Sequence, residues 1–370
     1  MAPEGRRARA IRLMVIFLAV AGLPGRRSLV STSASGSAGC DLFRGRWVAD
    51  ESYPLYNASS CPFVPDVFDC RRNGRPDSGY LKLRWSPAAG CELPRFDGAA
   101  FLRRWRGKTV MFVGDSLSMN QWVSLACMLH AALPAPGRVA YVPGEPVSSV
   151  RFVDYDLLLV LYHTTFLVDV VTEEGVGRVL RLDSMRNASA WIGAHLLVFN
   201  TWHWWTYRGK SQVWDLVQDG NSTYRDMDRV TAFSKGLSTW ARWVDANIDT
   251  SRTRVFFQGI SPSHYMSKQQ DSEVPARGGS CLKQTRPLQD AAGGEAVLPE
   301  QAVVRGVIDA MTSPVSLLDI TALSQLRIDA HPSVYAGRGR DGCDCTHWCI
   351  AGLPDAWNQI MNAMLLMQKD

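Results

Sequence analysis

A serine in a tight turn and a late aspartate–histidine pair are the residues of this 370-residue chain whose types could perform nucleophilic catalysis. Ser116 stands in Gly114-Asp115-Ser116, after the apolar run 110–113 and before apolar residues at helical spacing in 120–133. A strand, turn and helix in this order place a hydroxyl beside a helix N-terminus, whose free N–H groups stabilise an oxyanion. The alternative is that Asp115 or Ser116 only caps the helix.

A serine nucleophile needs a base, usually histidine, and an acid that orients the base. Asp344 and His347 lie three residues apart, so both can project from one loop. We expect His347 to accept the Ser116 proton and Asp344 to hold the imidazole tautomer. Cys345 and Cys349 flank His347, and bridges at both would pin the loop, because catalytic groups tolerate little displacement. The alternative is a turn motif beside a structural cysteine.

A third candidate, Asn200, directly follows the apolar run 196–199. It would lie at the carboxyl edge of a sheet, where the sites of α/β proteins assemble. Its amide could donate to the oxyanion together with the Ser116 N–H. The next five residues, 201–205, include three tryptophans that form either a floor for sugar rings or core packing. His203 is a poor candidate for the base.

The elements that must position these residues alternate between strand and helix after residue 108. The expected further strands are 155–162, 166–171, 179–182, 196–199, 254–257 and 315–318, and the expected helices are 227–248, 299–311 and 353–367. This alternation predicts one α/β domain over 108–370, with a mostly parallel sheet covered on both faces. Residues 267–296 are expected to form a long loop.

The stretch 40–107 has a different texture, with four cysteines, several prolines and little periodicity. It predicts a small disulfide-held module. Its recurring aromatic residues are expected to fill a small core, and a sugar-binding face is the alternative.

The N-terminal 27 residues explain the formal charge of +5, because they carry six arginines against one glutamate. The remainder is near neutral, so nucleic acid is not an expected partner. The uncharged run 13–23 is short against the roughly 20 residues that span a bilayer. We therefore expect residues 1–27 to be a signal peptide or a short signal anchor, and residues 28–39 to be a flexible linker.

Nine cysteines behind such a leader predict disulfides, and an odd count leaves one thiol over. Zinc is the rival interpretation for the late cysteines 343, 345 and 349, but their spacing lacks paired Cys-x-x-Cys knuckles, so no metal is expected. Three Asn-x-Ser/Thr sequons support a lumenal route. The expected glycosylation sites are Asn57, Asn187 and Asn221.

Together, the serine turn and the late Asp-x-x-His resemble the SGNH (GDSL-type) esterase superfamily. Longer stretches resemble the plant trichome-birefringence-like family of wall-polysaccharide O-acetyltransferases. These stretches are 40–47, 73–77, 85–96, 113–118, 200–205, 319–335, 344–349 and 352–355. The resemblance implies an SGNH/GDSL-like three-layer domain with a cysteine-rich N-terminal module packed on it.

Carried over residue by residue, the resemblance implies Ser116 as nucleophile, Asp344 and His347 as its partners, and Asn200 as an oxyanion donor. It also implies four bridges, with Cys343 left over: Cys40–Cys91, Cys61–Cys127, Cys70–Cys349 and Cys281–Cys345. The chain departs from many relatives, which have Arg at Met119, Gly at Trp202, Pro at Ala351 and a Trp-Gly pair in the loop before Cys281. Because Met119 lies next to the nucleophile turn and Trp202 next to Asn200, the first two departures leave the choice of substrate open.

The expected reaction is acetyl transfer through an acetyl-Ser116 intermediate to a hydroxyl of a cell-wall polysaccharide, with xylan as the first expectation. No bound cofactor is expected; acetyl-CoA or another acetyl carrier is the co-substrate. One alternative is a polysaccharide acetylesterase with the same triad, and another is a non-catalytic wall-polysaccharide binding protein. The resemblance implies residence in the Golgi lumen as a type II membrane protein anchored by the N-terminal segment, with secretion to the cell wall as the alternative.

Overall fold

The computed structural model describes residues 40–88, 91–134, 137–265, 280–289, 297–337 and 343–368. All of these belong to one compact unit, Gly39–Asp370. The expected leader 1–27 and linker 28–39 lie outside the described residues. Within the described ranges, every helix is too short or too polar to cross a bilayer.

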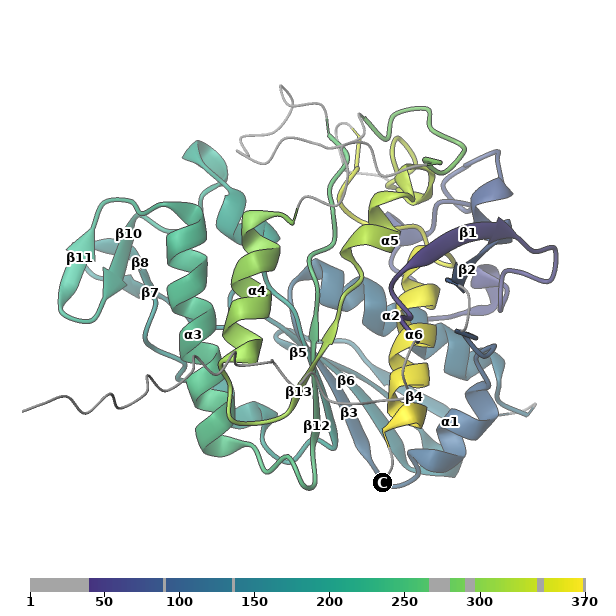
Figure 1. Ribbon diagram of the computed structural model, residues 1–370, viewed down its shortest axis with the longest axis horizontal. Helices are drawn as coiled ribbons and strands as arrows, with labels where there is room; N and C mark the ends of the chain where they lie inside the picture. Colours follow the sequence, from purple (N-terminus) through teal and green to yellow (C-terminus); the bar gives the residue numbers. More distant parts are fainter. Residues whose placement is uncertain are drawn as a thin grey trace, which may run out of the picture. The chain divides into compact units, whose positions relative to one another are not determined.

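A seven-stranded sheet forms the centre of this unit (Figure 1). Its first five strands run parallel, and the last two continue the sheet antiparallel. In spatial order the strands are β13 (Val315–Leu318), β12 (Arg254–Gln258), β9 (Leu196–Phe199), β3 (Thr109–Gly114), β6 (Leu157–His163), β5 (Val147–Phe152) and β4 (Val139–Val142). The prediction of an α/β fold with a mostly parallel central sheet is confirmed.

Helices cover both faces of the sheet because successive residues of its central strands are buried on opposite sides. Val110 and Phe112 of β3 belong to the core under α2 (Ser116–Ala131) and α6 (Leu353–Met367). Val113 belongs to the opposite core, under α3 (Arg229–Asn247) and α4 (Pro299–Asp309). The two helix layers lie on either side of the sheet in Figure 1. The short helices α1 (Gly98–Arg104) and α5 (Thr321–Gln325) complete the set of described α-helices.

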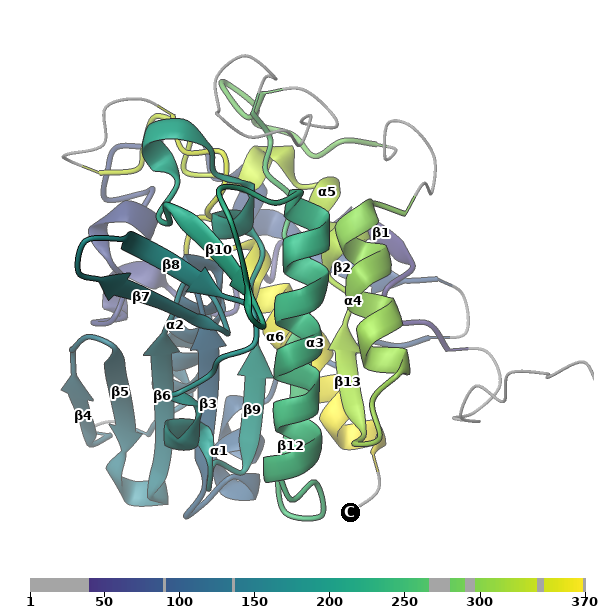
Figure 2. The ribbon, with the colours of Figure 1, turned by 90° about the vertical axis from the view of Figure 1, so that its left-hand side faces the viewer.

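A second, four-stranded sheet was not predicted. It has the order β11-β10-β8-β7, made of Ser222–Tyr224, Leu216–Asp219, Gly177–Arg181 and Asp169–Glu173. Figure 2 shows it above the main sheet, on the side where β6 ends. The sequence prediction treated 166–171 and 179–182 as further strands of one sheet. Phe166 and Val168 instead pack in the core with the tryptophans of 201–214, so the strand starts only at Asp169.

The N-terminal module contains one antiparallel pair, β1 (Gly45–Ala49) with β2 (Leu83–Pro87). Trp47 lies opposite Trp85, and the two ring centroids are 5.4 Å apart. Most of the module's aromatic side chains are buried, and they share one hydrophobic core with α2 and α6. This burial favours the interpretation of these rings as core. The module therefore has no separate core of its own.

Most predicted elements lie within a few residues of their observed bounds, and the strands 196–199 and 315–318 and the helix 353–367 match them. The helix predicted at 120–133 begins earlier, at Ser116, because Asp115 caps it there. The hairpin of β4 and β5 was missed. Of the predicted loop 267–296, only 280–289 is described, and it contains turns without helix or strand.

Candidate active site

Ser116 is the first residue of α2, directly after the turn that ends β3. The Asp115 side chain accepts a hydrogen bond of 2.9 Å from the Leu117 N–H and so caps the helix. Capping by Asp115 leaves the neighbouring Ser116 hydroxyl, which is partly exposed, at the positive end of the helix dipole. The cap and the candidate nucleophile are therefore adjacent residues of one turn.

Close approach of two strand ends requires glycine before this turn. A β-carbon on Gly114 would clash with the Asn200 carbonyl and would lie 2.5 Å from Ser118 Oγ. The Asn200 N–H donates to the Val113 carbonyl at 3.0 Å, so the ends of β9 and β3 are joined at the carboxyl edge. Asn200 thus lies beside the serine turn, as predicted from its place after the buried strand.

The three residues predicted to act together are in hydrogen-bond contact. His347 Nε2 lies 2.7 Å from Ser116 Oγ, and His347 Nδ1 lies 2.8 Å from Asp344 Oδ2. The carboxylate accepts from Nδ1–H, which leaves Nε2 of the neutral ring as the acceptor for the serine proton. Asp344 Oδ1 also accepts from the Thr346 and His347 backbone N–H groups, each at 3.1 Å. This geometry suits a serine nucleophile, a general base and its orienting acid.

The loop that carries His347 is held to the nucleophile helix by an amide that sequence reasoning missed. Asn120 Nδ2 donates to the Trp348 carbonyl at 3.0 Å, and Asn120 Oδ1 accepts from the Trp348 N–H at 3.1 Å. Asn120 is fully buried one turn after Ser116. A side-chain amide that donates to the carbonyl and accepts from the N–H of the same residue fixes both the distance and the orientation of that residue. Only its four-residue offset from Ser116 marked it in the sequence.

Two further histidines support this loop from behind. His331 Nδ1 donates to the His347 carbonyl at 2.6 Å, and its ring stacks on Trp348 with centroids 3.8 Å apart. His331 Nε2 meets His264 Nδ1 at 2.7 Å. Burial lowers the pKa of His331 well below its usual value and that of His264 to about 4, so both rings are neutral at neutral pH. These two histidines were not singled out from the sequence.

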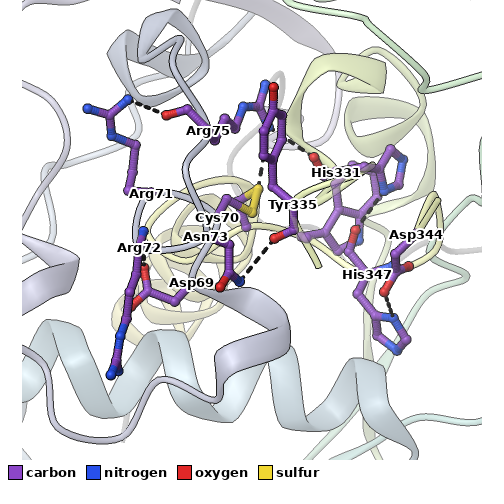
Figure 3. The surroundings of a disulfide bond; sticks show 12 residues. Asp69, Cys70, Arg71, Arg72, Asn73, Arg75, His331, Tyr335, Asp344 and His347 are labelled. Atoms are coloured by element: carbon purple, nitrogen blue, oxygen red, sulfur yellow. Dashed lines mark hydrogen bonds and ion pairs between the residues drawn. A yellow bond between two sulfur atoms is a disulfide. The ribbon is translucent and has the colours of Figure 1, made fainter. Parts of the chain in front are cut away.

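The N-terminal module reaches the same loop through a disulfide and an arginine (Figure 3). Cys70 is bonded to Cys349, two residues beyond His347. The buried Arg75 donates to the His331 carbonyl at 2.9 Å, and its guanidinium carbon lies 3.9 Å from the ring centroid of Tyr80. The N-terminal module therefore supports the loop that carries His347.

All four bridges implied by the resemblance are present in the structure, and Cys343 is the free cysteine among the described residues. The Sγ atoms of Cys281, Cys343 and Cys345 lie within 4.8 Å of one another. Because Cys281 and Cys345 are bonded to each other, only one thiol of this group is available as a metal ligand.

The aromatic segment after Asn200 divides between core and surface. Trp202 and Trp205 are buried and pack on Phe233 and Phe166, which favours the core interpretation for both. Trp204 is only half-buried.

His203, rated a poor base from the sequence, lies in the same segment. Its Nε2 donates to the Ser261 carbonyl at 2.9 Å, and burial lowers its pKa to about 4. Its Nδ1 lies 3.4 Å from Ser263 Oγ, which in turn lies 3.2 Å from Thr346 Oγ1. His203 is thereby held neutral beside the triad loop.

The asparagines of the three sequons, Asn57, Asn187 and Asn221, are all exposed. Their modification stays a prediction.

A family model described as "GDSL/SGNH-like Acyl-Esterase family found in Pmr5 and Cas1p" (PC-Esterase) matches residues 93–364, and a model described as "PMR5 N terminal Domain" matches residues 38–92. Protein trichome birefringence-like 38 of Arabidopsis thaliana is 52% identical over 344 residues, which cover 93% of this chain and 88% of that protein. Protein trichome birefringence-like 40 of the same plant is 50% identical over 338 residues, covering 90% of each chain.

Proposed function

This chain belongs to the PC-Esterase family of GDSL/SGNH-like acyl-esterases, and we propose that it is an O-acetyltransferase that modifies a plant cell-wall polysaccharide, with xylan as the first candidate. The observation that carries the proposal is the 2.7 Å contact between His347 Nε2 and Ser116 Oγ. Asp344 at the other ring nitrogen supports it, because this partner fixes the tautomer that accepts a proton. The relatives named above are plant proteins, which supports a wall polysaccharide as acceptor.

In the first half of the proposed reaction, Ser116 Oγ attacks the acetyl carbonyl of a donor while His347 Nε2 takes the hydroxyl proton. The resulting oxyanion is stabilised by the Ser116 N–H at the start of α2 and by the Asn200 side chain. Support for the second donor comes from the position of Asn200, which is buried beside the serine turn, where its N–H bonds the Val113 carbonyl at 3.0 Å. The carbonyl reforms, the donor's leaving group departs with the proton from His347, and acetyl-Ser116 remains.

In the second half, a glycan hydroxyl gives its proton to His347 and attacks acetyl-Ser116. The bond between the acetyl group and Ser116 breaks, and the serine oxygen recovers its proton from His347. Water in place of the glycan would make the same residues an acetylesterase. The donor that we propose is acetyl-CoA or another acetyl carrier, used as a co-substrate.

We further propose that the protein works in an oxidising compartment of the secretory pathway. The four disulfides support this location, because such bonds persist where thiols are not kept reduced. The Golgi lumen, with residues 1–27 as the anchor of a type II membrane protein, is the first candidate, and secretion to the wall is the second.

The test is to incubate purified protein with an acetyl donor and a panel of deacetylated wall oligosaccharides, and to analyse the products by mass spectrometry. We expect acetylated oligosaccharide and, in acid-quenched samples without acceptor, an acetylated peptide that contains Ser116. Ser116→Ala should abolish both, and Asp344→Asn should slow transfer by about 10⁴-fold. Acetate release without glycan product would replace the transferase with an esterase. Full activity of Ser116→Ala would eliminate the serine mechanism.

A further inference from the structure

The free thiol of the described chain touches a disulfide on the loop that carries Asp344. Cys343 Sγ lies 3.3 Å from Cys345 Sγ and 3.6 Å from Cys281 Sγ, and these two sulfurs are bonded to each other. Thiol–disulfide exchange begins when a thiolate meets a disulfide sulfur in line with the bond that breaks. The three sulfurs here form a triangle, so the Cys343 side chain must first turn to reach that line. The three sulfurs are a cluster that the proposed acetyl-transfer mechanism does not use.

We propose that Cys343 and the Cys281–Cys345 bond form an exchange site that moves the bridge of this loop between two cysteines. The Cys343 thiolate attacks Cys281 Sγ, a Cys343–Cys281 bond forms, and the Cys281–Cys345 bond breaks. The electron pair leaves on Cys345 Sγ, which takes up the proton that Cys343 released. One thiol and one disulfide are present before and after the step, so it needs neither an oxidant nor a reductant.

The surroundings of the thiol set the speed of this exchange. Burial raises the pKa of the Cys343 thiol, a hydrogen bond with Ser333 Oγ at 3.5 Å works the other way, and the Asp344 carboxylate raises the pKa again. Tyr265 packs against the same sulfur cluster. The thiol is therefore mostly protonated at neutral pH. Because the thiolate is the attacking form, the initial exchange rate should rise about tenfold per pH unit below the thiol pKa.

The exchange would move the disulfide of this loop from Cys345, the residue after Asp344, to Cys343, the residue before it. Asp344 now pairs with Ser333 through two backbone hydrogen bonds of 2.8 and 2.9 Å, and the Cys345 carbonyl accepts from the His264 N–H at 2.9 Å. Release of Cys345 from Cys281 removes the disulfide that now reinforces these backbone hydrogen bonds. We expect the isomer bridged through Cys343 to hold Asp344 less well against His347, an expectation that rests on the proposed function.

The test maps the disulfides of the full-length protein after incubation at pH 6, 7 and 8, with acid quenching, alkylation of thiols and peptide mass spectrometry. We expect a Cys281–Cys343 peptide with alkylated Cys345, and an initial rate of its appearance that rises about tenfold per pH unit. Cys343→Ser is the matched control and should keep only the Cys281–Cys345 bond. A wild-type sample in which alkylated Cys343 and the Cys281–Cys345 bond persist alone at every pH would overturn the proposal.

A second variant tests the alternative pairing without the need for exchange. In Cys345→Ser, the two remaining cysteines of the cluster should bond, leaving no alkylatable thiol at Cys281 or Cys343. Two free thiols in the folded variant would contradict the proposal. Because the readout is a bond and not a rate of acetylation, failure of the proposed enzyme activity would leave this result unaffected.

Discussion

Replacement of Asn120 by alanine tests whether this amide positions the triad histidine in addition to stabilising the fold. The amide makes two hydrogen bonds, of 3.0 and 3.1 Å, to the backbone of Trp348, which follows His347 directly. Asn120→Ala leaves one N–H and one C=O buried without these partners, at a cost of about 1–3 kcal/mol for each group. We therefore expect the free energy of unfolding to fall by about 2–6 kcal/mol.

The expected effect on reactivity follows from displacement of the loop. A misplacement of about 1 Å in a catalytic group costs on the order of 10²-fold in rate. Labelling of Ser116 by a fluorophosphonate measures this directly, because the reaction needs the activated hydroxyl but no glycan. Asn120→Ala should label about 100-fold more slowly than wild type under conditions in which circular dichroism shows both to be folded.

Asn358→Ala is the matched control. Asn358 is also fully buried and donates to the Gln121 carbonyl at 2.9 Å and to Ser124 Oγ at 3.0 Å, on the same helix α2. It should lose stability without a comparable loss of labelling. Labelling of folded Asn120→Ala at the wild-type rate, or an equal loss in Asn358→Ala, would refute the view that Asn120 positions His347.

Three further outcomes are expected. Gly114→Ala should lower the yield of folded protein sharply, because its β-carbon would meet the Asn200 carbonyl, and thermal melting of any folded fraction checks this. The double variant Cys70→Ser with Cys349→Ser should lose about 2–5 kcal/mol of stability in denaturant titrations and label Ser116 more slowly. Acidification from pH 6 to 4 should lower stability by up to about 1.4 kcal/mol per pH unit, measured as the midpoint of urea unfolding. In that range three histidines with lowered pKa values, the buried His264 and His331 and the half-buried His203, stay largely neutral in the fold but gain protons when unfolded, which destabilises the fold. Two buried aspartates with pKa values raised to about 6, Asp115 and Asp355, gain protons in the fold and offset part of this loss.

The sequence predicted the central sheet because buried parallel strands are apolar runs of four to eight residues, a local signal that 196–199 and 315–318 carry. It did not predict the second sheet, because strand partners are chosen by contacts far apart in sequence. β10 pairs with β8 in parallel, with Leu216 opposite Val179, and no local pattern in either strand specifies that choice.

The candidate site was likewise only partly predictable from the sequence. Residue type and spacing pointed to Ser116, Asp344 and His347, since each belongs to a short motif. Asn120 and His331 were missed because their roles exist only once residues far apart in the chain meet. Asn120 contacts a residue 228 positions away, and nothing in the helical pattern around it distinguishes this asparagine from a polar core residue.

The pattern of disulfides sets an order of events while the chain is being made. Cys40 and Cys61 find their partners 51 and 66 residues later, but Cys70 must wait for Cys349, 279 residues further on. At the usual pace of synthesis that delay is about 15–55 s. During this delay the thiol of Cys70 has no partner, while Cys40 and Cys61 can already form their disulfides. A nascent or truncated chain that lacks residue 349 therefore carries Cys70 without its disulfide partner.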